Sequence, residues 1–170
     1  MELRRLRCRH DRTRLVRGRE VPKPWQSSCW VDWSLRQRHD DIVRFTRNVL
    51  ALRRAHPVLR GGAFYRQEDI EWFDPSGQRP DWLDGRQKRL ACLIRCEDGP
   101  DLYLMSNADT EPMSFALPRP SSPGEWRLAV DTAQPSPRDV SAVGEEGALP
   151  NGTSYEMVAR SSAVLVTRHR

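Results

Sequence analysis

The chain has 170 residues, of which 38% are hydrophobic and 30% are charged, a length that suits one ordinary domain or a smaller domain with appendages. Its net charge of +5 is uneven, because residues 1–30 hold nine Lys/Arg and three acids (+6) and the other 140 hold 19 Lys/Arg and 20 acids (−1). The near-neutral body argues against a nucleic-acid partner. No apolar run approaches the roughly 18 residues of a membrane span, which argues against a membrane protein.

The basic charge belongs to the N-terminal segment. Eight arginines fall between positions 4 and 19 with little apolar periodicity, and their mutual repulsion predicts a disordered state. We therefore expect residues 1–29 to be a basic arm, and two origins for it stay open. It binds nucleic acid or an anionic surface, or it is a non-native start from a mispredicted or shifted reading frame. The absence of an apolar stretch behind the basic residues argues against a secretory signal, so we expect a cytoplasmic protein.

Four cysteines raise the question of disulfides or metal binding: Cys8, Cys29, Cys92 and Cys96. Without a signal peptide a disulfide framework has little support. Cys92 and Cys96 are an even number of residues apart in a predicted strand, so they form either a metal half-site or, the interpretation we favour, a pair of packed thiols. Cys8 has no second ligand pair at zinc spacing. We predict neither a metal nor a cofactor.

The strongest helix signal covers Ser34–His56. Apolar residues recur at three- and four-residue steps along it, forming a stripe of Ile42, Phe45, Val49 and Leu52, as expected of an amphipathic helix. Pro57 ends the pattern, because the residue before a proline is pushed out of the helical region. This stripe must pack on something or stay exposed.

From Phe64 onward the apolar period is two, which is typical of strands. Seven short strands are predicted, at residues 70–73, 90–96, 102–106, 113–117, 126–130, 155–159 and 163–167. Residues 134–150 are rich in Pro, Ser, Gly and acids and predict a long surface loop. Many strands with no helix between them favour an antiparallel sandwich. The predicted fold is mainly β, with one long amphipathic helix followed by an antiparallel β-sandwich.

The residues themselves do not indicate a catalytic site. Glycoside hydrolysis needs two carboxylates held across a sugar, and the acidic clusters, Glu68–Glu71 and Glu145–Glu146, lie in or beside turns where solvated acids are common. No nucleophile elbow or glycine-rich phosphate loop is present. We therefore assign no catalytic residue.

Several short runs together resemble a known family. In chain order they are Trp30–Leu35, Ala51–Arg60, Asp69–Phe73, Pro75–Gly77, Asp81–Trp82, Asn107 with Glu111–Pro112, Val130–Ala133, Pro135–Pro137, Ala159–Ser162 and Val164–Val166. Their order and spacing from Trp30 to Arg168 are similar to the C-terminal end of bacterial isoamylase-type glycogen-debranching enzymes, in glycoside hydrolase family 13 of the α-amylase superfamily. One departure is that Asp109 and Thr110 stand where related sequences often have two aromatic residues.

The resemblance implies a domain organisation. In this family a catalytic (β/α)8 barrel precedes a β-sandwich, so residues 30–62 would be a remnant of the barrel end, a loop plus the last helix, and residues 63–170 the C-terminal sandwich. The family's catalytic carboxylates lie in the barrel, upstream of these residues, and the barrel itself is absent here. The resemblance thus implies a C-terminal fragment of an enzyme that hydrolyses α-1,6 branch points of glycogen or limit dextrin, and we expect this fragment to be inactive alone.

The resemblance also suggests where an α-glucan would bind. Trp30, Asp32 and Trp33 would lie in the loop after the last barrel strand, where they either contact substrate or plug the junction between barrel and sandwich. The other body tryptophans, Trp72, Trp82 and Trp126, are expected in the sandwich core or at a domain interface and not as platforms for sugar rings. Without a barrel wall the helix stripe would stay exposed and drive self-association.

Two other hypotheses compete with the debranching fragment. A stand-alone carbohydrate-binding β-sandwich predicts an exposed aromatic row on one sheet face. A nucleic-acid-associated protein using the arginine-rich arm predicts binding that falls steeply with salt and is lost without residues 1–24.

Overall fold

The computed structural model describes residues 32–62, 64–66, 68–96 and 99–168. The predicted arm, Trp30, Cys8 and Cys29 lie outside these residues. The described chain falls into two units, one ending at Arg38 and one beginning at His39, and each is considered by itself. The second unit contains both the long helix and all of the strands, so the helix that the resemblance assigns to residues 30–62 clusters with the sheet.

The predicted helix Ser34–His56 is two helices, α1 (Leu35–Arg38) and α2 (Asp40–Ala55), separated at His39. Asp40 and Asp41 occupy the first turn of α2 and Arg53 and Arg54 its last turn, which suits the positive and negative ends of the helix dipole. A short 3-10 helix, η2 (Pro57–Arg60), follows α2. No helix in the described ranges is long and apolar enough to cross a membrane.

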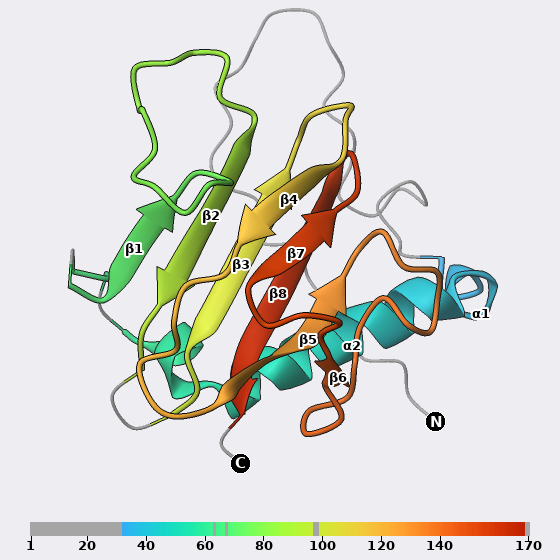
Figure 1. The fold of residues 1–170 in the computed structure, drawn as a ribbon. Helices are drawn as coiled ribbons and strands as arrows, with labels where there is room; N and C mark the ends of the chain where they lie inside the picture. Colours follow the sequence, from blue (N-terminus) through green and yellow to red (C-terminus); the bar gives the residue numbers. More distant parts are fainter. Residues whose placement is uncertain (1–31, 63, 67, 97–98, 169–170) are drawn as a thin grey trace, which may run out of the picture. The chain divides into compact units, whose positions relative to one another are not determined.

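All seven predicted strands are present, and all pair antiparallel (Figure 1). Their bounds are β1 (Ile70–Phe73), β2 (Arg89–Ile94), β3 (Leu102–Asn107), β4 (Met113–Ala116), β5 (Glu125–Asp131), β7 (Ser154–Met157) and β8 (Ser161–Arg168). An eighth, β6 (Gly147–Ala148), pairs with β5 inside the segment predicted as a loop. A six-stranded sheet has the order β1-β2-β3-β8-β5-β6, and β4 and β7 form a second sheet.

The two sheets pack face to face around one core, as in a sandwich whose second sheet is small. The strands β4 and β7 contribute Phe115, Tyr155 and Met157 to this core. The large sheet contributes alternate residues, which include Leu93 and Tyr103. Trp126 also belongs to this core, which confirms its predicted core position. Its indole N–H donates to the carbonyl of Pro118 at 2.7 Å.

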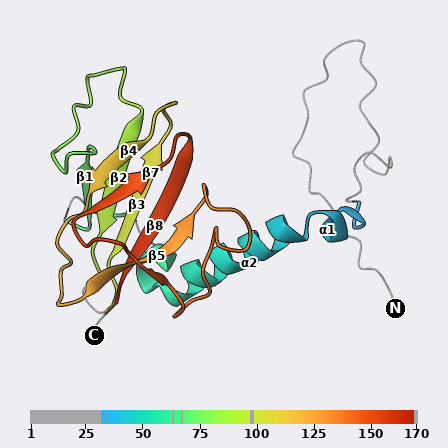
Figure 2. The same ribbon diagram turned by 45° about the vertical axis from the view of Figure 1, so that its right-hand side comes forward.

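The opposite face of the large sheet is covered in part by α2, which lies along its lower end in both ribbon views (Figures 1 and 2). Leu52 is buried there with Ile94, Leu102 and Val166, and Phe45 and Val49 pack against the same cluster. The expectation of an exposed stripe is therefore wrong for Phe45, Val49 and Leu52. Only Ile42, 58% exposed, keeps the predicted exposure.

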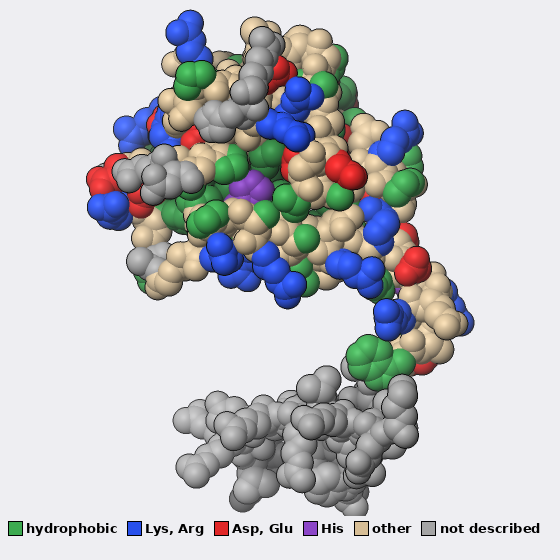
Figure 3. Space-filling model, turned by 90° about the horizontal axis from the view of Figure 1, so that it is seen from below, with side chains coloured by type: hydrophobic (Ala, Val, Ile, Leu, Met, Phe, Trp, Pro, Cys, Tyr) green, Lys and Arg blue, Asp and Glu red, His purple; other side chains and the backbone are tan. Residues whose placement is uncertain are grey.

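Polar contacts fix α2 to the loop after β5. The guanidinium of Arg44 forms an ion pair with Asp139 and donates to Ser136 Oγ at 3.0 Å and to the carbonyl of Pro137 at 3.3 Å. Seen from below, Lys and Arg side chains are spread along the rim of this side, around hydrophobic side chains (Figure 3). The sheet of this chain thus covers much of the apolar stripe of α2.

Candidate functional site

The predicted substrate-binding residues that the structure describes are Asp32 and Trp33. Asp32 Oδ1 accepts hydrogen bonds from the backbone N–H of Ser34 at 3.0 Å and from its hydroxyl at 2.7 Å. Both bonds lower the pKa of Asp32, and the bond from the hydroxyl has the larger effect. Trp33 is 64% exposed, so its ring is accessible, and its role stays a prediction.

The acidic clusters form local ion pairs. Glu68 lies 2.8 Å from Arg66, and Glu71 accepts a hydrogen bond from Arg95 Nε at 2.7 Å. Glu146 accepts from the backbone N–H of Gly144 at 2.7 Å. In these contacts the carboxylates stabilise turns and strands.

Cys92 and Cys96 are free thiols. Cys92 is buried in β2, and burial raises its pKa to about 11. Cys96 lies beyond the end of β2, so the two do not share the single strand that was predicted. Within the described ranges no group of three or more His, Cys, Asp or Glu side chains is placed to hold a metal ion.

A cleft of about 430 Å³ lies where β1 ends, β2 begins and the β3–β4 loop passes. It is lined by Asp74, Pro75, Ser76, Arg86, Gln87, Lys88, Arg89, Asp109, Met113 and Ser114. Three separate segments of the chain contribute these residues. The cleft was not predictable from the sequence, because its walls adjoin one another only through strand pairing.

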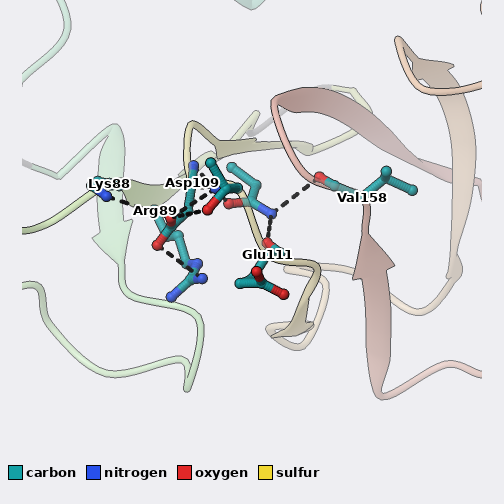
Figure 4. Close-up of polar contacts among 7 residues, drawn as sticks. Lys88, Arg89, Asp109, Glu111 and Val158 are labelled. Carbon is teal, nitrogen blue, oxygen red and sulfur yellow. Dashed lines mark hydrogen bonds and ion pairs between the residues drawn. The ribbon is translucent and has the colours of Figure 1, made fainter.

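Asp109 is the charged centre of the cleft (Figure 4). Arg89 Nη2 lies 3.0 Å from Asp109 Oδ2, and Lys88 Nζ lies 3.5 Å from Oδ1. The backbone N–H of Thr110 also donates to Oδ1 at 2.7 Å. This bond is the main cause of the lowered pKa of Asp109, with the charges of Lys88 and Arg89 adding to it. The carboxylate is thus ionised at neutral pH.

Asn107 holds the loop that carries Asp109. Its buried side-chain amide donates to the carbonyl of Glu111 at 2.8 Å and to that of Val158 at 3.0 Å, while its Oδ1 accepts from the N–H of Asp109 at 3.1 Å (Figure 4). One side chain therefore links the end of β3 to the β3–β4 loop and to the β7–β8 turn. This explains why asparagine, with two donors and an acceptor, occupies a position that the family resemblance also singled out.

Trp72 in β1 and Trp82 in the β1–β2 connection form a second notable feature. Their ring centroids are 5.8 Å apart with planes at 80°, an edge-to-face pair, and their exposed fractions are 40% and 59%. Within this chain neither ring lies in the sandwich core, which is one of the two positions predicted for them.

These features can be compared with known proteins. The family model described as Isoamylase 1-3, C-terminal matches residues 71–165, a stretch that starts in β1 and ends in β8. The chain belongs to this isoamylase family. This confirms the resemblance found in the sequence, and it identifies the antiparallel β unit as an isoamylase C-terminal domain.

Relatives of the family align with most of the chain. Isoamylase from Pseudomonas amyloderamosa is 26% identical over 151 residues, covering 84% of this chain and 20% of that protein. Isoamylase 3, chloroplastic, from Oryza sativa subsp. japonica is 30% identical over 132 residues, covering 77% of this chain and 16% of that protein. The chain therefore spans about a fifth of the length of the curated relatives that it matches.

Solved structures share the fold at lower sequence identity. The Group B Streptococcus pullulanase SAP superposes with a TM-score of 0.54 at 14% identity, over 80% of this chain and 18% of that chain. The catalytic module of the pneumococcal glycogen-degrading virulence factor SpuA gives 0.52 at 14% identity, over 81% and 20%. These likenesses agree with an antiparallel β unit that is a small part of larger enzymes.

Proposed function

We propose that this chain is the C-terminal portion of an enzyme that hydrolyses α-1,6-glucosidic branch points in glycogen or limit dextrin, and that it has no hydrolase activity by itself. The observation that carries the proposal is the match of residues 71–165 to the isoamylase C-terminal family. The acids of the described unit support the second half of the proposal, because Glu71, Asp109 and Glu146 are each bound by neighbouring cations or N–H groups. Hydrolysis would instead need two carboxylates facing each other across a sugar.

A reducing-end assay tests the proposed inactivity. Purified chain incubated with glycogen or pullulan should release no more reducing ends than a buffer blank. Activity that disappears in Glu71→Gln or Asp109→Asn would overturn the proposal, because it would place the chemistry in this chain. Activity that survives both substitutions would be traced to a contaminant by a mock purification from cells lacking the gene.

A second test concerns the rest of the enzyme. The DNA upstream of the Trp30 codon, translated in all three frames, should encode an α-amylase-type barrel. If no frame does so, the chain is not the end of such an enzyme, and a stand-alone carbohydrate-binding domain becomes the better hypothesis.

We further propose, by family resemblance, that Trp30, Asp32 and Trp33 contact the glucan in the complete enzyme. The accessible ring of Trp33 supports this role. Asp32 would contact the glucan while its Oδ1 accepts the two hydrogen bonds from Ser34 beside the start of α1. In the complete enzyme, Trp33→Ala should raise KM for glycogen with kcat little changed, whereas a plug at a domain junction would lower thermal stability instead.

A further inference from the structure

The cleft beside Asp109 has more positive than negative side chains in its walls. Arg86, Lys88 and Arg89 contribute three cations, and Asp74 and Asp109 contribute two carboxylates, which leaves a net charge of +1. Residues 31–170 taken together have 19 Lys/Arg and 20 acids, a net charge of −1. The cleft is therefore a local concentration of positive charge in a chain body that is slightly negative.

Both carboxylates of the cleft are fixed by hydrogen bonds of their own segments. Asp74 Oδ1 accepts a hydrogen bond from the hydroxyl of Ser76 at 2.7 Å, inside the turn after β1. Asp109 Oδ1 accepts from the backbone N–H of Thr110 at 2.7 Å. Each carboxylate thus has a donor close in sequence, and neither uses all the N–H groups that the three cations carry.

The cations of the cleft keep donors for a further acceptor. In the part of the chain that the structure describes, the buried Nε of Arg89 has no hydrogen-bond partner, although its Nη2 lies 3.0 Å from Asp109. Lys88 lies a longer 3.5 Å from Asp109, and its side chain is 57% exposed. Arg86 pairs with Asp84, which is not part of the cleft lining, and a surface ion pair of this kind contributes little to stability. An acceptor from outside the chain can therefore be bonded without breaking a buried contact.

The walls of the cleft are held in place before any ligand arrives. The N–H of Ala116 in β4 donates to the carbonyl of Pro75 at 2.9 Å, and the N–H of Ala108 donates to that of Lys88 at 2.9 Å. The side chain of Asn107 fixes the β3–β4 loop as described above. A preorganised site loses little conformational entropy on binding.

We propose that this cleft binds a phosphate monoester, whose oxygens lie against Lys88 and Arg89. Both cations already turn toward one anion, the carboxylate of Asp109 (Figure 4). A phosphate monoester carries a charge of about −1.5 to −2 at pH 7 and three strong acceptor oxygens, so it can accept charge-assisted hydrogen bonds from cations that the two carboxylates leave in excess. The volume of about 430 Å³ leaves room for the group that carries the phosphate. This inference rests on the charges of the cleft and is independent of the proposed hydrolase family function.

Isothermal titration calorimetry of the full chain with inorganic phosphate tests the site, at an ionic strength held constant with sodium chloride. The wild-type chain should show saturable binding, and Lys88→Gln should weaken it about tenfold, as for one charge-assisted hydrogen bond. Asp109→Asn should instead tighten binding about tenfold, because the amide keeps an acceptor for the N–H of Thr110 and removes a competing negative charge. Arg47→Gln, which removes an exposed cation from α2, is the matched control and should bind like the wild type.

A variant on the opposite wall keeps the test decisive if Lys88→Gln does not fold. Ser114→Asp adds a carboxylate to the cleft lining from β4 and alters none of the three cations. It should weaken phosphate binding about tenfold. Thermal melts without ligand show which variants are folded, and unchanged binding by folded Ser114→Asp would place the phosphate elsewhere and overturn the proposal.

Two further ligands show which part of a sugar phosphate is recognised. Glucose 6-phosphate that binds more tightly than inorganic phosphate indicates additional contacts to the sugar, and equal binding indicates that the phosphate group alone is recognised. Both results support the site. Glucose that binds as tightly as glucose 6-phosphate would overturn it. So would the absence of saturable phosphate binding, equal losses in Lys88→Gln and Arg47→Gln, or a folded Asp109→Asn variant that does not bind phosphate more tightly.

Discussion

The hydroxyl of Tyr155 donates a hydrogen bond of 2.8 Å to Asp131 Oδ2, joining the two-stranded sheet to the end of β5 in the six-stranded sheet. Both residues are buried. Burial, and then the bond to Asp131, raise the pKa of Tyr155, so its phenol stays protonated and remains a donor. The contact therefore adds a polar link between the two sheets to the apolar packing of their shared core.

Tyr155→Phe should lower the free energy of unfolding by about 1.5–3 kcal/mol, because it leaves a buried carboxylate oxygen short of one charge-assisted bond. Urea denaturation followed by fluorescence measures the change. Tyr65→Phe is the matched control, since its hydroxyl donates to the carbonyl of Val58 at an exposed position, and it should cost less than about 0.5 kcal/mol. Equal losses in the two variants would mean that the link between the sheets is unimportant.

Asn107 should be unusually intolerant of its acidic isostere. Asn107→Asp keeps the acceptor for the N–H of Asp109 but removes the donors to Glu111 and Val158 and places a buried negative charge opposite two carbonyls. We expect a loss of about 3–5 kcal/mol at pH 7, partly recovered near pH 4 as the new carboxyl protonates. Asn107→Ala should lose about 2–4 kcal/mol with no such recovery. Denaturation at both pH values separates these outcomes.

The packing of α2 on the sheet can be tested with two leucines of the same helix. Leu52 is buried against Ile94 and Val166, whereas Leu50 is exposed. Leu52→Ala should cost about 2–5 kcal/mol, since it leaves a cavity in a core, and Leu50→Ala should cost less than about 0.5 kcal/mol. If Leu52→Ala is as mild as Leu50→Ala in thermal denaturation, α2 does not pack on the sheet in solution.

Alkaline pH should reveal the buried thiol of Cys92. Its pKa is about 11 in the folded chain against a reference of 9.0, so above pH 9 the unfolded state releases a proton that the folded state keeps. Stability from this group is complete below pH 9 and falls as the pH rises toward 11, by about 1–3 kcal/mol in all. Cys92→Ala should show a shallower decline over that window. An unchanged decline would show that other groups, such as the buried tyrosines, cause it.

The sequence by itself determined where the strands lie and which of their residues share a face of the sheet. The period of two in β2 and β3 separates Leu93 and Tyr103 from Ile94 and Leu102, and the structure packs the first pair against β4 and β7 and the second against α2. Alternation along a strand is a local property, set by backbone geometry, so it can be read without knowing the fold. The ordered motifs from Trp30 to Arg168 likewise sufficed to indicate the isoamylase family.

Only the tertiary structure decided what covers each face and which loops meet. An apolar stripe such as Phe45, Val49 and Leu52 shows that a partner exists but not which one, because burial of apolar surface is non-directional; the partner is the sheet of the same chain. The cleft around Asp109 depends on β1, β2 and β3 lying side by side. The exposure of Trp72 also follows from the fold, since β1 is an edge strand of the large sheet.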